Sequence, residues 1–436
     1  MHCTRVRGIA VAVSMAAIAL LLAPMAVAQD EKPTWSIEFV RPAIDEVVTG
    51  EITASVKVYP PSVDPTHLSI GFGDAGHVPM ARVPGTHYWR ATVDTTRVLN
   101  GPAALHVYGM APGVANRRTA TLVDVRVDNP LECYFGNIHS HTYYSDGCML
   151  PSDAYAYARD VAGMDFFCLT DHLEMVSEAE WRDIRETAWR MNEDGKFAAF
   201  PGLEWTKRTG HANLLDPPGR IWPPDMESLF EALPDADVVA MFNHPGDGTG
   251  DWGWKGLPYH EGADENMHLM EVRSDQELQA YILALNNGWH IAAAGTDDTH
   301  SPDWGTRGAW TGMWLPALTS DNVISALGRR HCYSTNDRNC RVLFRVNGEM
   351  MGTVIDDPVR QVVLEIDIDD PDPGDKTSKI EIYQDGEMID MPVFGQEKVR
   401  HTMTLRPEKG EHYFFVRVGQ EDANVLTTAP VWVTVE

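Results

Sequence analysis

Two histidines that stand two positions apart are the first residues in this chain whose types and spacing could bind a metal. His139 and His141 lie in the stretch GNIHSHTYYSDG, which covers residues 136–147. If residues 135–141 form a short buried strand, alternate side chains face the same side, so both imidazoles would point to one place. Neutral imidazole is a common ligand of divalent metals, and the pair therefore predicts part of a metal site. Taken alone, such a pair is more often a polar surface feature.

Further along the chain, one apolar segment after another ends in a side chain that could bind a metal. The predicted strands cover residues 164–172, 197–205, 210–215, 238–245, 267–272 and 291–300. The side chains at their ends, or at the start of the next strand, are Asp171, His172, Glu204, His211, His244, Asp297, Asp298 and His300. Each one alone could be a helix cap, an ion-pair partner or a buried histidine. Together they predict one shared site, because enzymes built from βα units carry their chemistry at the carboxyl ends of the strands.

The segments that would position these strands have helical spacing. Apolar residues recur every three or four positions in 151–162, where Ser152 or Asp153 could cap the helix, and again in 179–192. After the last candidate ligand we predict a strand at 310–315 and a helix at 320–328. The middle of the chain is therefore expected to be an α/β structure.

The ordered motifs HSH, SDG, TDH, GLEW, GHxNLL, NHPG and DTH resemble the polymerase and histidinol phosphatase (PHP) family of metal-dependent phosphoesterases, and within it the CehA/McbA-like metallohydrolases. The resemblance covers residues 134–335. It implies a distorted (β/α)7 barrel that holds two or three divalent ions, Zn2+, Mn2+ or Fe2+, at its strand ends. The ligands it implies are His139, His141, Asp146, His172, Glu204, His211, His244, Asp298 and His300, with Glu204 as the bridging carboxylate. The final D-x-H of the family selects Asp298, and Asp297 is the alternative.

The amidohydrolase barrel is the competing fold, because it also opens with an HxH motif. We would then expect a bridging lysine on a middle strand. Glu204 stands at that point in this sequence, which favours the PHP fold.

Other polar residues near the candidate ligands could contact a substrate. Asp171 could relay a proton or orient a ligand. Lys207, Arg208 and Arg307 could hold an anionic ester, and a solvated loop is the alternative for all three. The stretch 246–255 is rich in Gly and Trp. It could be a lid over an aromatic or sugar-like leaving group, although packing tryptophans are the preferred interpretation.

Short alternating runs on both sides of the middle segment predict two immunoglobulin-like β-sandwiches. We therefore expect a signal peptide at 1–28, a β-sandwich at 29–130, a PHP-like metallohydrolase at 131–337 and a second β-sandwich at 338–436. The last part contains an acidic run with Asp367, Asp369, Asp370, Asp372 and Asp375. These residues could bind Ca2+, but they lack EF-hand spacing, so a solvated acidic loop is the preferred interpretation.

The N-terminus predicts export. Arg5 and Arg7 precede an apolar run at 9–25, and Ala26-Val27-Ala28 is typical of a cleavage site. We expect cleavage after Ala28, a secreted or periplasmic protein and no stable membrane anchor; an uncleaved anchor is the alternative.

Five cysteines would remain after cleavage, and an odd number leaves at least one thiol without an intramolecular partner. Cys168, in an apolar run, is predicted to be a buried free thiol. Cys332 could pair with Cys340, and Cys133 with Cys148.

The charge balance limits the partners. The chain has 63 acidic and 35 basic residues and a net charge of −28, which argues against nucleic acid, whose phosphates need Lys and Arg. The resulting hypothesis is a metal-dependent phosphoesterase for a small anionic ester. The alternatives are a CehA-type carboxylester or carbamate hydrolase, and an exported binding protein that contacts glycan or the cell surface through its β-sandwich domains.

Overall fold

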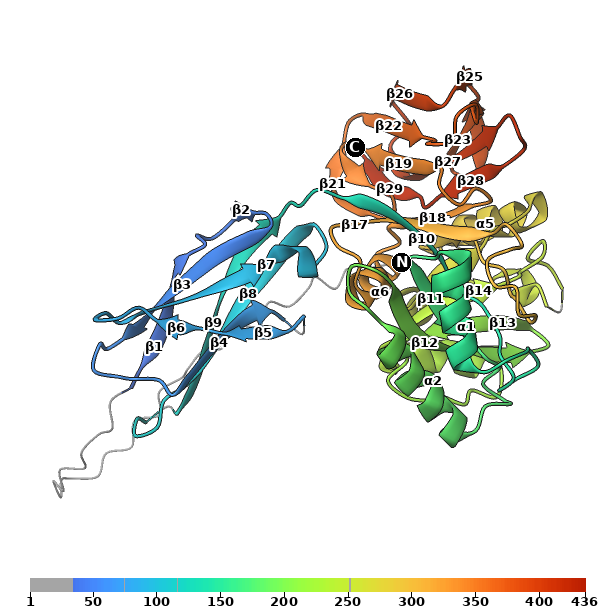
Figure 1. The fold of residues 1–436 in the computed structure, drawn as a ribbon. Coiled ribbons are helices and arrows are strands. Elements are labelled where there is room, and N and C mark those ends of the chain that lie inside the picture. The colour runs from blue at the N-terminus through green and yellow to red at the C-terminus, as the bar shows by residue number, and fades with distance from the viewer. Residues whose placement is uncertain (1–33, 74, 116, 251) are drawn as a thin grey trace, which may run out of the picture.

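The computed structural model describes residues 34–436 apart from 74, 116 and 251, so the predicted signal peptide lies outside the described residues. The protein is a mixed α/β structure, with one large mixed sheet and several smaller, largely antiparallel sheets (Figure 1). Within the described residues, no helix is long and apolar enough to cross a membrane.

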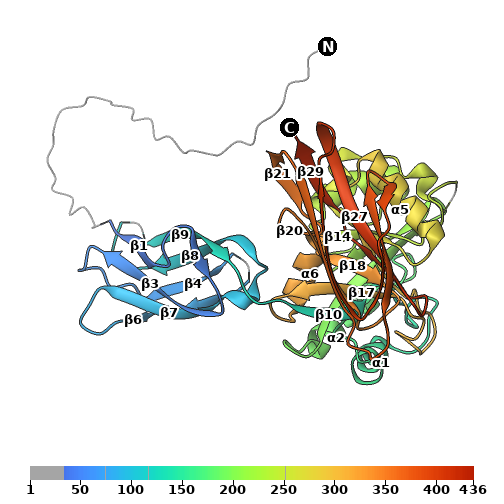
Figure 2. The same cartoon turned by 90° about the horizontal axis from the view of Figure 1, so that it is seen from above.

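The N-terminal part consists of two sheets around one hydrophobic core. Its strands are β1 Ser36–Arg41, β2 Glu46–Val48, β3 Glu51–Tyr59, β4 His67–Phe72, β5 His77–Pro79, β6 Ala81–Arg82, β7 Tyr88–Asp94, β8 Gly101–Met110 and β9 Arg118–Val127, with the short helix η1 Thr95–Arg97. One sheet has the order β1-β3-β7-β6 and the other β2-β9-β8-β4-β5. Their inward side chains form a cluster of their own. The two sheets lie to one side of the rest of the molecule (Figure 2), and the Arg97 guanidinium contacts Asp194 at 2.7 Å.

The central sheet carries the candidate ligands. Its first strands along the chain are β10 Glu132–Asn137, β11 Phe166–Leu169, β12 Ala198–Lys207, β13 Gly210–Leu215, β14 Val239–Asn243, β15 Met267–Glu271, β16 Ala292–Ala294, β17 Trp310–Leu315 and β18 Cys332–Thr335. They stand in the order β16-β15-β14-β13-β12-β11-β10-β17-β18. Strands β10, β11 and β12 run parallel, as do β14, β15 and β16, whereas β13 is antiparallel to both of its neighbours. The predicted series of βα units is therefore interrupted by a hairpin between β12 and β13.

The predicted strand through the HxH motif was too long. Strand β10 ends at Asn137, whose side-chain oxygen accepts a hydrogen bond from the His139 amide at 3.0 Å. This local bond replaces a regular ladder contact, because Asn side chains compete with the backbone for hydrogen bonds. Ser140, between the two histidines, forms an isolated bridge with Thr299.

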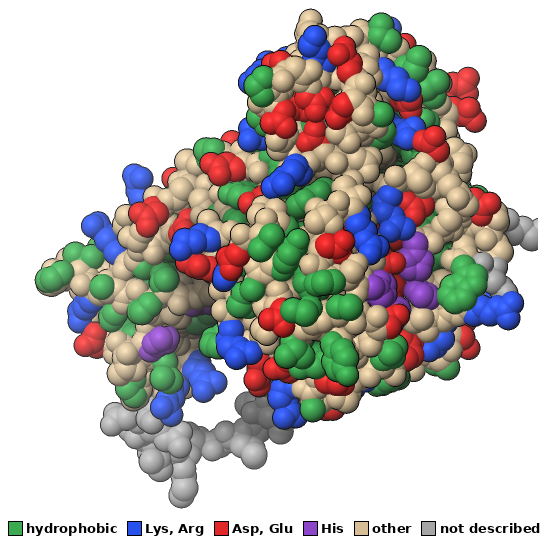
Figure 3. All heavy atoms as spheres, turned by 45° about the vertical axis from the view of Figure 1, so that its right-hand side comes forward, with side chains coloured by type: hydrophobic (Ala, Val, Ile, Leu, Met, Phe, Trp, Pro, Cys, Tyr) green, Lys and Arg blue, Asp and Glu red, His purple; other side chains and the backbone are tan. Residues whose placement is uncertain are grey.

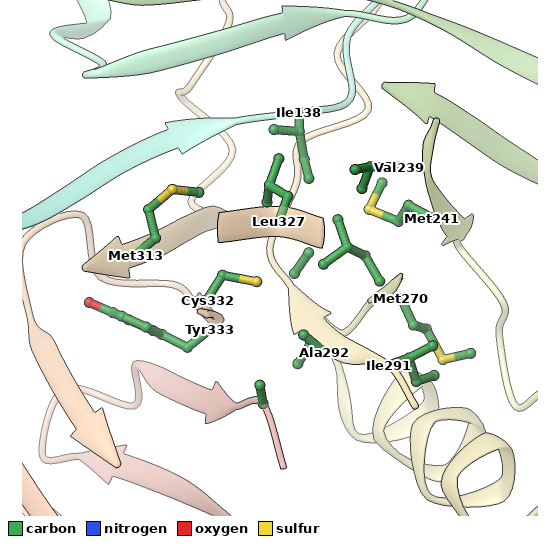
Figure 4. Close-up of a cluster of buried hydrophobic side chains, with 14 of the residues drawn as sticks. Ile138, Val239, Met241, Met270, Ile291, Ala292, Met313, Leu327, Cys332 and Tyr333 are labelled. Carbon is green, nitrogen blue, oxygen red and sulfur yellow. The ribbon is translucent and has the colours of Figure 1, made fainter. Parts of the chain in front are cut away.

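The sheet curls so that its distant strands meet. The Ser140–Thr299 bridge joins the segments that follow β10 and β16, and Thr311 Oγ1 on β17 donates to the Gly295 carbonyl at 2.9 Å. Apolar side chains from β14 to β18 point toward one another inside this curl, and Leu327 lies among them (Figure 4). The candidate ligands thus stand on a rigid, densely packed support.

Helices cover the sheet. They are α1 Pro151–Tyr157, continued by the single turn η2 Ala158–Ala162, α2 Glu178–Met191, α3 Met226–Ala232 with η3 Leu233–Asp235, η4 Trp254–Gly256, α4 Glu261–Asp264, α5 Asp275–Asn287 and α6 Ser320–Gly328. The predicted N-cap of the first helix, Ser152 or Asp153, was wrong. Leu150 is the N-cap, and the Leu150 amide donates a hydrogen bond to the Asp153 carboxylate at 3.3 Å. Pro151 explains the shift, since proline is favoured in the first turn.

The C-terminal part is joined to the central sheet. Its strands are β19 Arg341–Val346, β20 Glu349–Met350, β21 Val354–Val359, β22 Val362–Asp369, β23 Thr377–Gln384, β24 Glu387–Asp390, β25 Val393–Gln396, β26 Lys398–Leu405, β27 Gly410–Gln420, β28 Val425–Thr428 and β29 Val431–Val435. Strand β28 pairs with β18, so β27 and β23 extend the central sheet. A separate sheet has the order β20-β19-β22-β26. Buried side chains of both sheets belong to the same core as the middle of the chain.

The cysteines that the structure describes are all free thiols. The possible pairs Cys332–Cys340 and Cys133–Cys148 are therefore not formed. Cys168 is fully buried, as predicted.

Candidate metal centre

His139 and His141 face each other at the centre of a buried cluster. Their Nε2 atoms lie 3.2 Å apart, and neither side chain is exposed. The Asp298 Oδ1 atom lies 3.3 Å from His139 Nε2 and 3.2 Å from His141 Nε2. Three donor atoms therefore converge on one place, where they could hold a metal ion.

A second group extends from His141 toward solvent. It contains His141, Asp146, His172 and His300, whose ligand atoms all lie within 4.8 Å of one another. The Asp146 carboxylate links them, since its Oδ1 atom is 3.1 Å from His300 Nε2 and 3.5 Å from His172 Nε2.

A third group is centred on Glu204. His172 Nδ1 lies 2.8 Å from one carboxylate oxygen, and His211 Nδ1 lies 3.1 Å from the other. His244 lies beside this group, with its Nε2 atom 3.5 Å from the same oxygen as His211. Because His141 and His172 each belong to two groups, the three groups form one continuous cluster.

The topology explains why these residues meet. Glu204 lies near the carboxyl end of β12, and the antiparallel β13 begins close by, with His211 opposite Thr206. Reversal of one strand brings the start of β13 to the same edge as the ends of its parallel neighbours. The structure thus brings together all nine residues implied as ligands by the sequence motifs.

Burial and neighbouring charges together set the pKa values of the residues in the cluster. Burial alone would lower the pKa of His139, but Asp298, Glu204 and Glu271 outweigh it and raise the pKa well above its ordinary value. Burial dominates for His141 and lowers its pKa. Burial would raise the pKa of Glu204, but His139 and the neighbouring histidines hold it well below its usual range. The carboxylate is therefore ionised and available to a cation.

Two atoms of the cluster are donors that fit a cation. Glu204 Oε2 is buried, and His172 Nδ1, which lies 2.8 Å from it, forms its hydrogen bond with Thr206 Oγ1 at 2.7 Å, so this oxygen accepts no hydrogen bond among the described residues. His211 Nε2 is likewise buried without a partner. A carboxylate oxygen and an imidazole nitrogen are both metal donors, so the residues present fit divalent ions of the zinc, manganese or iron type.

The backbone is held in an uncommon conformation at two of these residues. His244 and Asp298 have φ angles of 28° and 48°, in the left-handed region that non-glycine residues seldom adopt. The His244 amide donates to Glu271 at 2.5 Å, and the Asp298 amide donates to the His139 carbonyl at 3.1 Å. Contacts within the cluster thus fix both conformations, as is usual at functional sites.

Glu271 and Asn243 are parts of the cluster that the sequence prediction missed. Glu271 Oε1 is 2.6 Å from His139 Nδ1, and Asn243 Nδ2 donates to Glu204 Oε1 at 2.7 Å. Both residues end apolar strands. The signal that selected Glu204 therefore also marks Glu271.

Asp171 and Asp297 lie beside the cluster, outside its groups of converging donor atoms. Asp171 accepts hydrogen bonds from the Thr142 amide and hydroxyl, both at 2.7 Å, and from Ser145 Oγ at 2.6 Å. It thereby fixes the turn that follows His141. Asp297 accepts a bond from the Ala309 amide at 3.3 Å, whereas Asp298 faces the histidines.

The basic residues predicted to hold substrate have other contacts in this structure. Lys207 Nζ lies 2.6 Å from Glu174, and Arg307 donates to Ser301 Oγ at 3.0 Å. The Arg208 carbonyl accepts the Trp252 amide at 2.8 Å. This last bond connects the loop that contains Trp252 to the segment between Glu204 and His211.

The two tryptophans of that loop differ. Trp254 is fully buried among aromatic side chains, which confirms the packing interpretation for this residue. Trp252 is 51% exposed, and its ring centroid lies 5.4 Å from that of His211. In the space-filling view, histidine side chains gather in one surface patch beside basic and hydrophobic side chains (Figure 3).

Comparisons with known proteins do not identify a family. No protein-family model and no curated protein matches the sequence. An endo-beta-1,4-mannanase from Thermotoga petrophila is similar over 24% of this chain and 22% of its own, with 16% identity and a TM-score of 0.20. Fibronectin(III)-like modules of CbhA from Clostridium thermocellum align over 92% of this chain and 94% of theirs, with 7% identity and a TM-score of 0.17. Neither likeness carries an inference about fold or function.

Proposed function

We propose that this chain is a metal-dependent hydrolase of small anionic esters, and that phosphoesters are its substrates. The observation that supports this most is the sharing of His141 and His172 between neighbouring ligand groups. A structural metal site usually uses four ligands in a closed arrangement. A continuous set of nine candidate ligands that reaches the surface at Asp146 and His300 is instead suited to several ions and a substrate.

The residues that would hold the ions are the three groups around His139, Asp146 and Glu204. Divalent cations bound by such a set polarise a phosphoryl or carbonyl oxygen and make water a stronger nucleophile near neutral pH. We assign the middle of the chain to a PHP-type (β/α)7 barrel, on the basis of its motifs and of the curled sheet with ligands at one edge.

The chain's own residues have separate roles in this proposal. Glu271 orients His139 and His244, and Asp171 holds the turn that carries His141. Trp252 offers an exposed aromatic surface next to His211 for the leaving group. The choice of phosphoesters over carboxylesters or carbamates depends on the motif resemblance, and export depends on the predicted signal peptide.

Metal content and ester hydrolysis, measured on the same preparation, test the proposal. We expect two or three ions per chain by elemental analysis after reconstitution with Zn2+, Mn2+ or Fe2+. We expect metal-dependent hydrolysis of p-nitrophenyl phosphate or bis(p-nitrophenyl) phosphate and little hydrolysis of p-nitrophenyl acetate. His139→Ala should abolish activity, whereas His67→Ala, an exposed histidine on β4, should leave it unchanged.

Three outcomes would redirect the assignment. Turnover of the acetate ester alone would favour the carboxylester alternative. Bound metal without turnover of any ester would favour an exported binding protein. A chain that binds no metal would contradict the catalytic hypothesis.

A further inference from the structure

Three aspartates that do not belong to the histidine cluster come together in the folded chain. Asp337 lies in the turn after β18, Asp370 directly follows β22, and Asp375 precedes β23. Each offers a carboxylate oxygen within 4.8 Å of the others. Asp337 is buried and Asp370 is only 2% exposed, so the prediction of a solvated acidic loop is wrong for Asp370.

The hydrogen bonds that Asp337 and Asp370 accept come from neutral groups, so they supply no positive charge to balance the carboxylates. Asp337 Oδ1 accepts the amides of Asn339 and Cys340 at 2.8 and 3.0 Å, and Asp370 Oδ1 accepts the Asp372 amide at 2.8 Å. Among the described residues, no Lys, Arg or His forms an ion pair with any of the three aspartates. Buried carboxylates without a counter-charge are costly, because desolvation penalises the ionised form.

The side chain of Gln420 is directed into this group. It is 5% exposed, and its Nε2 atom lies 2.6 Å from Asp370 Oδ2 and 3.3 Å from Asp337 Oδ2. Its Oε1 atom is buried and has no hydrogen-bond partner in the described part of the chain. Since the two ends of an amide have nearly the same shape, a half-turn of the amide would direct this oxygen at the carboxylates.

Further oxygen atoms nearby also lack partners. Asp375 Oδ1, Thr377 Oγ1 and Asn339 Oδ1 are buried without a hydrogen bond among the residues described. Thr377 is the cross-strand neighbour of Gln420, so the two side chains stand on the same face of the sheet. Buried acceptors without partners are rare in native proteins, and a group of them around carboxylates is a set of oxygen donors that fits a cation.

We propose that Asp337, Asp370, Asp375 and Gln420 form a second metal site, which binds a hard divalent cation of the Ca2+ type. All the available donors are oxygen atoms, which Ca2+ prefers and which distinguish this site from the histidine-rich cluster. Cys340 is close by, but burial raises the pKa of its thiol well above the ordinary value, so it stays protonated and is a poor ligand.

The position of the site gives the cation a structural role. Asp337 follows the central-sheet strand β18, whereas Asp370 follows β22 of the separate sheet, and Gln420 ends β27. A bound cation would neutralise the carboxylates and connect these three segments. The site is independent of the proposed hydrolase activity.

Calcium titration of the chelator-treated full chain tests this inference. We expect isothermal titration calorimetry to show one Ca2+ per chain and thermal unfolding to shift upward by several degrees when Ca2+ is added. Asp370→Asn and Asp375→Asn should each weaken Ca2+ binding at least tenfold and abolish the shift. Asp375 is less buried than Asp370, so its variant is expected to fold even if the Asp370 variant does not.

Two controls distinguish this site from others. Asp372→Asn changes an exposed aspartate of the same loop and should preserve both the binding heat and the thermal shift. His139→Ala disrupts the histidine cluster and should also preserve them. The inference would be overturned if the unaltered chain showed neither heat nor shift with Ca2+. It would equally be overturned if the effect persisted in both Asp370→Asn and Asp375→Asn.

Discussion

His139 Nδ1 lies 2.6 Å from Glu271 Oε1, and both side chains are fully buried. This contact leaves His139 Nε2 directed toward His141 and Asp298. Burial would raise the pKa of Glu271, but Arg273 and then His139 outweigh it and lower the pKa to about 2. The carboxylate is therefore ionised at neutral pH, and its second oxygen accepts the His244 amide. One side chain thus positions two candidate ligands.

Glu271→Gln should weaken metal binding without removing a ligand. The amide lacks the negative charge that favours the Nδ1–H form of His139, and the loss of such a partner typically costs 10–100-fold in metal affinity. Competition with a chromogenic chelator would measure the change. Glu277→Gln is the matched control, because Glu277 also contacts Arg273 but not His139. Equal affinities in the two variants would contradict a positioning role for Glu271.

The sharing of ligands between groups predicts an unequal response to two histidine substitutions. His172 belongs to the groups around Asp146 and Glu204, whereas His300 belongs only to the first. His172→Ala should therefore lower the metal content by more than His300→Ala. Elemental analysis of both variants, reconstituted side by side, measures the difference. Loss of the same number of ions from both would mean that the groups do not act as separate, linked sites.

Local pattern predicted much of the fold. The strands β13 and β17 and the helix α6 have the predicted bounds. Their apolar periodicity is strong, and their ends are set by nearby residues. The direction of β13 was not predictable in this way, because strand pairing depends on contacts between segments far apart in sequence. The end of β10 was also missed, since it depends on one bond from Asn137.

The composition of the candidate site was easier to predict than its internal roles. The HxH spacing selected His139, the strand-end position selected Glu204, and the chain topology brings the two residues together. Sequence cannot distinguish a residue that faces a metal from one that orients a ligand, because both are His, Asp or Glu. Only the distance between Glu271 Oε1 and His139 Nδ1 identifies Glu271 as a residue that orients a ligand. The sequence analysis weighed Asp370 and Asp375 as Ca2+ ligands but preferred a solvated loop, and it missed Asp337, because this residue comes from a segment that meets the other two only in the folded chain.

Trp252 should affect substrate binding more than the chemical step. Its exposed ring lies beside His211 and could stack on an aromatic leaving group. If the proposed activity holds, Trp252→Ala should raise KM for p-nitrophenyl phosphate by roughly tenfold, as expected for loss of about 1.4 kcal/mol of stacking, with little change in kcat. Trp189→Ala, an exposed tryptophan on α2, is the control. A fall in kcat with KM unchanged would exclude a binding role.

The buried His268 should make the protein less stable in mild acid. Burial, and then the nearby Arg330, lower its pKa to about 4 from an ordinary value of 6.5, and its Nδ1 atom is buried without a hydrogen bond among the described residues. As the pH falls below 6.5, the unfolded chain binds a proton at this histidine that the folded chain does not accept until about pH 4. The free energy of unfolding therefore decreases over this range, by about 2 kcal/mol between roughly pH 7.5 and 5 for this group.

His268→Gln removes this titration, so urea unfolding of the variant should lose about 2 kcal/mol less than the unaltered chain between those two pH values. What is compared is the decrease in the free energy of unfolding between the two pH values, because the substitution itself changes that free energy at both of them. His67→Gln controls for an exposed histidine and should leave this decrease unchanged. If the His268 variant lost as much stability in acid as the unaltered chain, His268 would be protonated in the folded protein and its burial would not determine its charge.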